Sequence, residues 1–248
     1  MFIDDFIEGI RSYPKAWFFI SQHRLWHFVL WTGLFSIILW LSGIYAAWWL
    51  ADALNNYLFL WFGENLWQGG LLKQIGIVLL LIPIITLMLK FYKYFVLSLF
   101  SPLLSIIAEK VQEIDTQQKS PTGIRVFWNN FMRSLYMNLR SLVAELFLTA
   151  ACFVIAFIPI INIFTPLLLL TVDSYFWGAA MLDYRHEFHG LNGKDSMAWT
   201  KKHKGLAIAN GIVWNFLLLI PIIGALVGIV LSVTAAGLAA NTLQKKAS

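Results

Sequence analysis

The sequence predicts an all-α, polytopic membrane protein. Hydrophobic residues make up 59% of its 248 residues and charged residues only 12%, far from the composition of soluble domains. Apolar runs long enough to enter or cross a bilayer follow one another along the chain. A short apolar motif with a proline occurs twice, at 158–162 and at 220–224. These observations indicate a single membrane domain over residues 1–248, built from helices.

The N-terminal segment has the pattern of an amphipathic helix. Its apolar residues follow i, i+3, i+4 spacing, with charged residues on the opposite face. This pattern predicts a helix that lies in the membrane interface. The segment begins acidic and has no cleavage signature, so we do not expect a signal peptide. The apolar residues are Phe2, Ile3, Phe6, Ile7 and Ile10, and the charged ones are Asp4, Asp5, Glu8 and Arg11.

Two long transmembrane helices are expected next. Phe28–Ala51 contains no charged residue and is about 36 Å long as a helix, enough to cross the hydrocarbon core. The second is Ile75–Leu89, which continues as Phe91–Leu104 past Lys90 and Lys93. Because this pattern is too long for one crossing, we expect the helix to leave the membrane near the two lysines and to end around Ser101-Pro102.

The repeated motif predicts two helical hairpins. Proline ends the incoming helix, and Asn162 or Gly224 tolerates the reversal of the chain. The tips carry no charge, which favours insertion into the bilayer. Arms of about 14–19 residues give helices of about 21–29 Å, so full crossing and half penetration both stay open. The arms are Ser141–Phe157 with Phe164–Leu182, and Leu206–Leu219 with Ala225–Leu238.

The polar segment Asp183–Gly205 joins the two hairpins. We expect a short interfacial helix over Ser196–His203 and a surface cap at Asp183-Tyr184-Arg185. His186, Glu187 and His189 are close in sequence, but no third and fourth ligand accompanies the histidines. The sequence therefore predicts a solvated loop here, and no metal site.

Basic residues are distributed asymmetrically. All of the 18 Lys and Arg residues except Lys73 lie before residue 28, in 90–140, in 184–205 or at the C-terminus. By the positive-inside rule, this distribution predicts cytoplasmic N- and C-termini. The net charge of +5 then reflects cytoplasmic loops facing anionic headgroups, and we expect the lipid bilayer and no nucleic acid as a partner.

Two places suggest sites for an anion. The first is the polar segment before the first span, where the candidate substrate-binding residues are Ser21, Gln22, His23, Arg24 and His27. The alternative is that its basic side chains extend to the lipid headgroups. The second is Thr165, expected as the N-cap before Pro166, because helix N-termini attract anions. Its alternative is a capped turn that satisfies its own hydrogen bonds.

Four charged residues in or beside apolar runs are candidates for a coupling or pathway site. Lys90 and Lys93 share a helix face and would attract an anion, unless they extend to the headgroups. An acid within an apolar run is costly, which makes Asp173 either a proton-coupling group, a partner of Arg140 or Asn215, or a residue that reaches the interface. Glu145 has the same alternatives.

Enzyme chemistry has no support in the sequence. The chain contains no nucleophile elbow, phosphate-binding loop, dinucleotide fingerprint or paired carboxylates. We therefore expect no enzyme activity, no cofactor and no metal.

Several short motifs, in order over nearly the whole chain, resemble the CysZ/EI24 family of membrane proteins. They are Phe19-Ile20-Ser21-Gln22, the run 101–109 beginning Ser-Pro-Leu-Leu-Ser, Phe157-Ile158-Pro159 with Pro166, Asp183-Tyr184 and Ile220-Pro221. The resemblance implies two long transmembrane helices, two partly penetrating hairpins, homo-oligomers and a place in the cell inner membrane. It also implies a permease for a small inorganic anion, most simply sulfate, serving sulfur assimilation; we consider its passage either passive or proton-linked.

The residues just before the first span depart from that resemblance. The bacterial permeases have a Gly-apolar-Arg-Arg run implicated in sulfate binding before the first span, where this chain has Arg24-Leu25-Trp26-His27. A dianion needs several strong donors, and two fixed charges are missing. The alternative function is therefore a non-transporting membrane organiser or stress-related protein of the EI24 type.

Overall fold

The protein is helical throughout the part of the chain that the structure describes. The computed structural model describes residues 2–31, part of 33–49, 71–119 and 123–247, and no strand occurs among them. The all-α class is confirmed. The helices are α1 (Phe2–Gln22), α4 (Leu71–Thr116), α5 (Ile124–Ile155), α6 (Pro159–Asn162), α7 (Thr165–Phe188), α8 (Gly193–Lys202), α9 (Lys204–Leu218) and α10 (Pro221–Ala247).

Among the residues that the structure describes, four segments are long and apolar enough to cross a membrane. They are Thr86–Thr116, Ile124–Ile155, Thr165–Phe188 and Val227–Lys246, while Lys204–Leu218 is apolar but shorter. Large apolar side chains such as Leu89, Phe147 and Leu167 point outward from these helices. Such surfaces belong in lipid, so the chain is a multi-pass membrane protein.

The predicted first span lies partly outside the described residues. Every described residue from 26 to 49 is helical. Leu30, Trp31, Tyr45 and Trp48 are all exposed. A helix whose apolar side chains face outward in this way suits contact with lipid.

Helix α4 is longer than the sequence predicts. The expected end at Ser101-Pro102 is wrong, because the helix continues without interruption to Thr116. Leu104, Ile107 and Val111 are fully buried beyond the proline. Burial of this face, together with the backbone bonds of the following turns, outweighs the one hydrogen bond that Pro102 removes.

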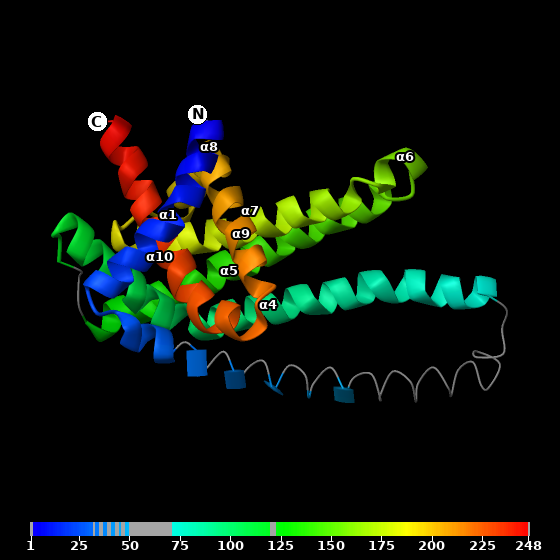
Figure 1. Ribbon diagram of the computed structural model, residues 1–248, viewed down its shortest axis with the longest axis horizontal. Coiled ribbons are helices and arrows are strands. Elements are labelled where there is room, and N and C mark those ends of the chain that lie inside the picture. Colours follow the sequence, from blue (N-terminus) through cyan, green and yellow to red (C-terminus); the bar gives the residue numbers. More distant parts are fainter. Residues whose placement is uncertain are drawn as a thin grey trace.

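The chain reverses at each of the two proline motifs. Helix α5 ends at Ile155, the short α6 begins at Pro159, and α7 returns alongside α5 (Figure 1). The tip is apolar and outward-facing, with Phe157 88% exposed. At the second motif α9 ends at Leu218 and α10 begins at Pro221. The first arm differs from the sequence prediction, because Ser141–Phe157 is only the C-terminal half of the 32-residue α5.

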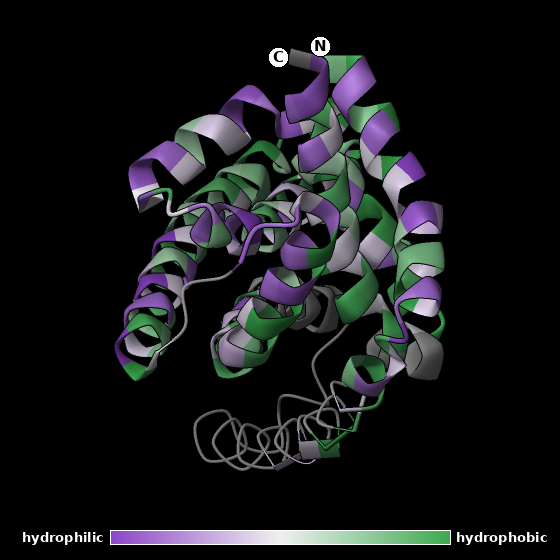
Figure 2. Ribbon diagram, turned by 90° about the vertical axis from the view of Figure 1, so that its left-hand side faces the viewer, coloured by the Kyte–Doolittle hydropathy of each residue, from purple (hydrophilic) through white to green (hydrophobic). Residues whose placement is uncertain are grey.

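Helix α10 is enclosed by other helices over much of its length. It contacts α1, α4, α7 and α9, and nearly all of its side chains from Ile229 to Asn241 are buried. A helix that is apolar all round is expected to be enclosed by others. Both chain termini lie at the same end of the molecule, where hydrophilic residues gather (Figure 2).

Helix α1 turns two of its acidic residues, Asp5 and Glu8, toward the protein, while Asp4 and Arg11 are exposed. Asp5 lies 3.0 Å from His203 Nδ1, while Glu8 is 2.5 Å from Lys15 Nζ and 3.2 Å from Lys246 Nζ. Burial opposes ionisation of Glu8, but the hydrogen bonds from Lys15 and Lys246 hold its pKa below the ordinary value. The apolar residues Ile3, Ile7 and Ile10 are exposed on the outer face. In this first part of α1, two acids are thus paired inside the protein while these apolar side chains face outward.

Helices α7 and α9 approach closely at two glycines. A Cβ atom at Gly211 would lie 1.9 Å from the backbone oxygen of Ser174, and one at Gly178 would lie 1.9 Å from that of Ala207. Backbone atoms in a packed helix pair cannot move aside locally. Close contact of this kind is how small residues bring membrane helices together.

Gly211→Ala is expected to lower the free energy of unfolding by about 1–3 kcal/mol or more, because it forces α7 and α9 apart. Equilibrium unfolding in mixed micelles, followed by circular dichroism, measures the loss. Gly193→Ala is the control, because its Cβ meets only the flexible Met137 side chain, with the sulfur closest at 2.8 Å. Equal effects at both positions would contradict the close approach.

Candidate functional site: a buried cluster of four charges

Two lysines and two carboxylates from three helices meet in the interior. Lys90 and Lys93 lie one turn apart on α4, Glu145 lies on α5 and Asp173 on α7. We call these four residues the charge cluster. Each was a candidate on sequence grounds, and the structure brings all four together. The three helices that carry these residues contact one another in pairs, and α5 and α7 run side by side above α4 in Figure 1.

Glu145 is the innermost member. Its side chain is 0% exposed and accepts hydrogen bonds from Lys93 at 2.8 and 3.0 Å. Lys90 Nζ bonds the same carboxylate, and the Tyr94 hydroxyl donates to it at 2.7 Å. Three donors therefore compensate the cost of burying this charge.

Asp173 is the more open carboxylate. Its side chain is 29% exposed and lies 2.9 Å from Lys93 Nζ and 3.4 Å from Lys90 Nζ. Asn215 of α9 donates to Asp173 at 3.3 Å and to Ser174 at 3.1 Å. Of the two partners considered for Asp173, Asn215 is found and Arg140 is not. The structure adds the two lysines, which sequence reasoning had not paired with it.

The charge cluster is internally balanced. Two ammonium groups face two carboxylates, with lysine side chains only 9% and 15% exposed. The structure thus excludes the alternative in which Lys90 and Lys93 extend to the headgroups. Because a buried charge is stable only with its partner, any reaction that removes one charge from this set must be matched by another.

The polar segment before the first span forms a separate, exposed group. Ser21 and Gln22 end α1, and His23 and Arg24 lie in the turn that follows. His27 Nδ1 lies 3.3 Å from the carbonyl oxygen of Arg24. Within the described residues, no hydrogen bond or ion pair joins this group to the charge cluster.

Arg24 adopts a left-handed backbone conformation, with φ of 56°. This is the position where the permeases that the chain resembles have glycine, which enters that region at least cost. Arg24→Gly is therefore expected to leave stability unchanged or to raise the free energy of unfolding by up to about 1 kcal/mol. Unfolding in mixed micelles measures it, with Arg24→Ala as the variant that keeps a Cβ. A stability below that of Arg24→Ala would contradict the role of the backbone.

Thr165 is the first residue of α7, and Phe164 occupies the N-cap position one residue earlier than predicted. The Thr165 hydroxyl is buried without a hydrogen-bond partner among the described residues. Asp173 follows eight residues later, about 12 Å along the helix axis. The structure thus places Thr165 on the same helix as Asp173, but outside the charge cluster.

Sequence reasoning missed a second buried group, on the polar side of the same helices. Arg133 binds Asp183 through two bonds of 2.8 and 2.9 Å and lies 3.4 Å from Glu187. Ser134 and Ser105 donate to Glu187, and Ser196 donates to Asp183 at 2.5 Å. We call Arg133, Asp183 and Glu187 the arginine cluster.

The expectation of a surface cap at 183–185 and a solvated loop at 186–189 is wrong. Helix α7 continues to Phe188, and Asp183, Arg185, His186 and Glu187 are all buried. Arg185 binds Asn241 at 2.9 Å and Gln244 on α10. Helix α7 continues because each polar side chain finds a partner on a neighbouring helix. The i, i+4 spacing of Asp183 and Glu187 was the only local signal, since Arg133 lies 50 residues away.

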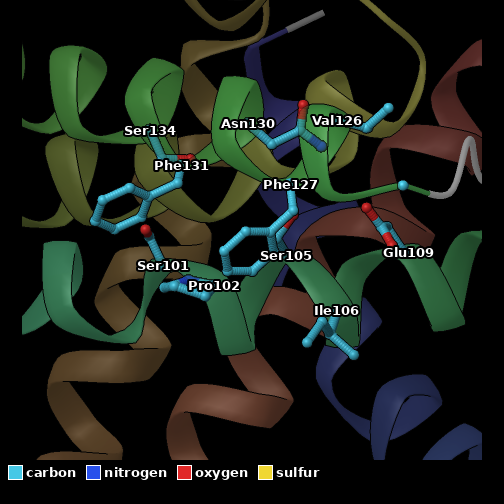
Figure 3. Close-up of a pocket in the computed structure, with 11 residues that line it drawn as sticks. Ser101, Pro102, Ser105, Ile106, Glu109, Val126, Phe127, Asn130, Phe131 and Ser134 are labelled. Carbon is cyan, nitrogen blue, oxygen red and sulfur yellow. The ribbon is translucent and has the colours of Figure 1, made fainter.

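A pocket of about 190 Å³ opens between α4 and α5 beside the arginine cluster (Figure 3). Ser105 and Ser134 line it while holding Glu187, and the buried Ser101 hydroxyl has no partner in the described part of the chain. Phe127 and Phe131 form the α5 wall. The pocket is large enough for water, and the serine hydroxyls in its lining are hydrogen-bonding partners for it.

These features define a multi-pass helical membrane protein with buried clusters of charged residues between its helices. Among the described residues, no group of His, Cys, Asp and Glu side chains suits a metal ion. A family model described as EI24, sulfate transporter CysZ/etoposide-induced protein 2.4, matches residues 12–228. The chain belongs to this family, which confirms the resemblance, and the description names a transporter and no enzyme activity. No curated protein matches the chain.

Proposed function

We propose that the protein is a permease for a small inorganic anion such as sulfate, with the charge cluster as the station at which the anion is held. The observation that carries the proposal is the pair of ammonium groups of Lys90 and Lys93, both bound to Asp173. Two positive charges on one helix face match a dianion, and charge-assisted bonds from both would offset its dehydration.

Proton uptake gives this station a way to accept the anion. Without a bound anion, the two carboxylates are ion-paired with the two ammonium groups, so the charge cluster has no net charge. Protonation of Asp173 and Glu145 releases both lysines, and a dianion then restores neutrality. Anion binding is thereby linked to two protons, and acid on the side of uptake favours it. Asp173 is the more exposed of the two carboxylates, so water and protons reach it first.

The arginine cluster supplies the second polar station along the same helices. Asp183 and Glu187 follow Asp173 on α7 by 10 and 14 residues, about 15–21 Å along the axis. Along α5 and α4, between the two clusters in sequence, Asn138 of α5 donates to Ser98 of α4 at 3.4 Å. We propose that solutes and protons pass between these stations, with the exposed group at Ser21–His27 and the N-terminus of α7 at Thr165 as further binding positions.

The same proposal includes the placement of the chain. Residues 1–248 form one domain in the cell inner membrane, with cytoplasmic termini and a role in sulfur assimilation. Helix α1 lies in the interface through Ile3, Ile7 and Ile10, and the proline-tipped helix pairs enter the bilayer from the cytoplasmic side. The protein assembles as a homo-oligomer. The common location of the termini and the basic residues near them support this orientation.

The test is uptake of radiolabelled sulfate into proteoliposomes, with acidic or neutral buffer outside. Wild-type uptake should saturate and rise under acid, and Lys93→Gln should lower it about tenfold or more, equivalent to about 1.4 kcal/mol. Asp173→Asn imitates the protonated acid, so it should retain uptake while losing much of its pH dependence. Lys110→Gln, which changes an exposed lysine, is the matched control. Arg24→Ala tests the exposed group separately.

One observation favours the second candidate, a non-transporting membrane organiser of the EI24 type. The charge cluster is fully paired, and Trp26 and His27 stand where the permease pattern has two arginines. If wild-type protein that is folded by circular dichroism takes up no sulfate under either condition, the permease proposal fails for this anion. If Lys93→Gln takes up sulfate as fast as wild type, the charge cluster is not the anion-binding site of the permease.

A further inference from the structure

A second cavity lies away from the charge cluster, between α5, α7 and α8. Its volume is about 300 Å³. Helix α5 contributes Arg140, Ala144 and Leu148, α7 contributes Ala179, and α8 contributes Lys201. None of the four residues of the charge cluster lines it, so it is a separate site.

The chemistry of this cavity changes from one end to the other. Along α5 the lining runs from Ser134 past Arg140 to Ala144 and Leu148, which lies two turns beyond Arg140 in the apolar arm. On α7 small residues at 179 and 180 leave space between the helices. The resulting space is apolar at one end and polar at the other, with the cations Arg140 and Lys201 in its lining, which is the form that an amphiphile fills.

The cavity also crosses the edge of the apolar part of the chain. Arg140 is the last charged residue before the arm Ser141–Phe157, whose single charge, Glu145, is bound within the charge cluster. On α7 the apolar arm ends at Leu182, and Lys201 belongs to the polar segment that follows. Arg140 and Lys201 therefore lie at headgroup depth, with Leu148 toward the acyl chains.

The charge at the cavity mouth is positive. Arg140 and Lys201 are exposed, and neither forms an ion pair within the described part of the chain. Asp183 is the acidic residue of the lining, but Arg133 holds it through two hydrogen bonds and Ser196 through a third. Two uncompensated cations beside an apolar groove attract an anionic headgroup.

We propose that this cavity binds one anionic phospholipid. The phosphate lies between Arg140 and Lys201, and an acyl chain lies against Ala144, Leu148 and Ala179. A free inorganic anion would satisfy the two cations but leave the apolar part of the cavity unfilled. The lipid fills both parts, and it joins α5 and α7 to α8 at the level where the helices leave the membrane. This site does not depend on the proposed transport function.

The test is native mass spectrometry of the intact protein, titrated with phosphatidylglycerol or phosphatidylcholine from mixed micelles. Wild-type protein should retain one phosphatidylglycerol molecule with higher affinity than any phosphatidylcholine. The double variant Arg140→Gln/Lys201→Gln should weaken that binding about tenfold or more, equivalent to about 1.4 kcal/mol. Arg125→Gln/Lys202→Gln is the control, because it removes the same charge from exposed positions outside the cavity.

A second variant tests the apolar part of the site. Ala144 is exposed at the cavity wall, so Ala144→Trp fills the groove without entering the core. It should abolish the tight phosphatidylglycerol adduct while both cations remain. Equal weakening by the cavity and control double variants would overturn the proposal in favour of general surface attraction. Competition by soluble glycerol phosphate at the same concentration as the lipid would overturn it in favour of a free-anion site.

Discussion

Glu145→Leu is expected to lower the free energy of unfolding by about 3–5 kcal/mol. The substitution leaves two buried ammonium groups, Lys90 and Lys93, with Asp173 as their sole carboxylate. It also removes the acceptor of the Tyr94 hydroxyl, which adds the cost of an unsatisfied buried donor. Equilibrium unfolding in mixed micelles, followed by circular dichroism, measures the change.

A double variant distinguishes lost charge balance from lost packing. Glu145→Leu/Lys90→Met removes one charge of each sign and keeps the Lys93–Asp173 pair of 2.9 Å. Most of the lost stability should return, and Tyr94→Phe should recover part of the remainder. Lys110→Met is the surface control, because Lys110 and Glu113 are 51% and 31% exposed and such pairs contribute less than about 1 kcal/mol. If the double variant is less stable than Glu145→Leu, charge balance does not govern the site.

Arg133→Leu is expected to cost a similar amount, about 3–5 kcal/mol. It leaves Asp183 and Glu187 one turn apart on α7 without their cation, with only serine hydroxyls as donors. Part of the stability should return as the pH falls, because a protonated carboxyl group needs no cation. The measurement is unfolding in mixed micelles at two values of pH.

Geometry as well as charge should matter at Arg133. Arg133→Lys keeps the positive charge but cannot form the paired bonds to Asp183, so its loss should lie between wild type and Arg133→Leu. Arg125→Leu, at the exposed start of α5, should change stability by less than about 0.5 kcal/mol. Packing, and not ion pairing, would hold this region together if two results coincided. Arg133→Lys would lose as much stability as Arg133→Leu, and Arg133→Leu would recover none of its stability at low pH.

What the sequence determined is the class of the protein and the identity of its unusual residues. Composition and long apolar runs require a membrane environment, and the positions of Pro159 and Pro221 mark where helices begin anew. Motifs spread along the chain identify the family, because order over long distances is specific even where each motif is short. Lys90, Lys93, Glu145 and Asp173 stood out because a charge within an apolar run is costly and needs a reason.

Only the tertiary structure decided how those residues are paired. Glu145 and Lys93 are 52 residues apart, and Arg133 and Asp183 are 50 apart, so no local spacing reveals either contact. Long-range contacts also explain why the helix ends predicted at Ser101-Pro102 and after Leu182 are wrong. Pro102 and the polar run after Leu182 end helices in isolation, but here the following turns are buried against α10 or hydrogen-bonded to other helices. Burial and long-range pairing contribute more free energy than local propensity, and neither can be read before the helices are assembled.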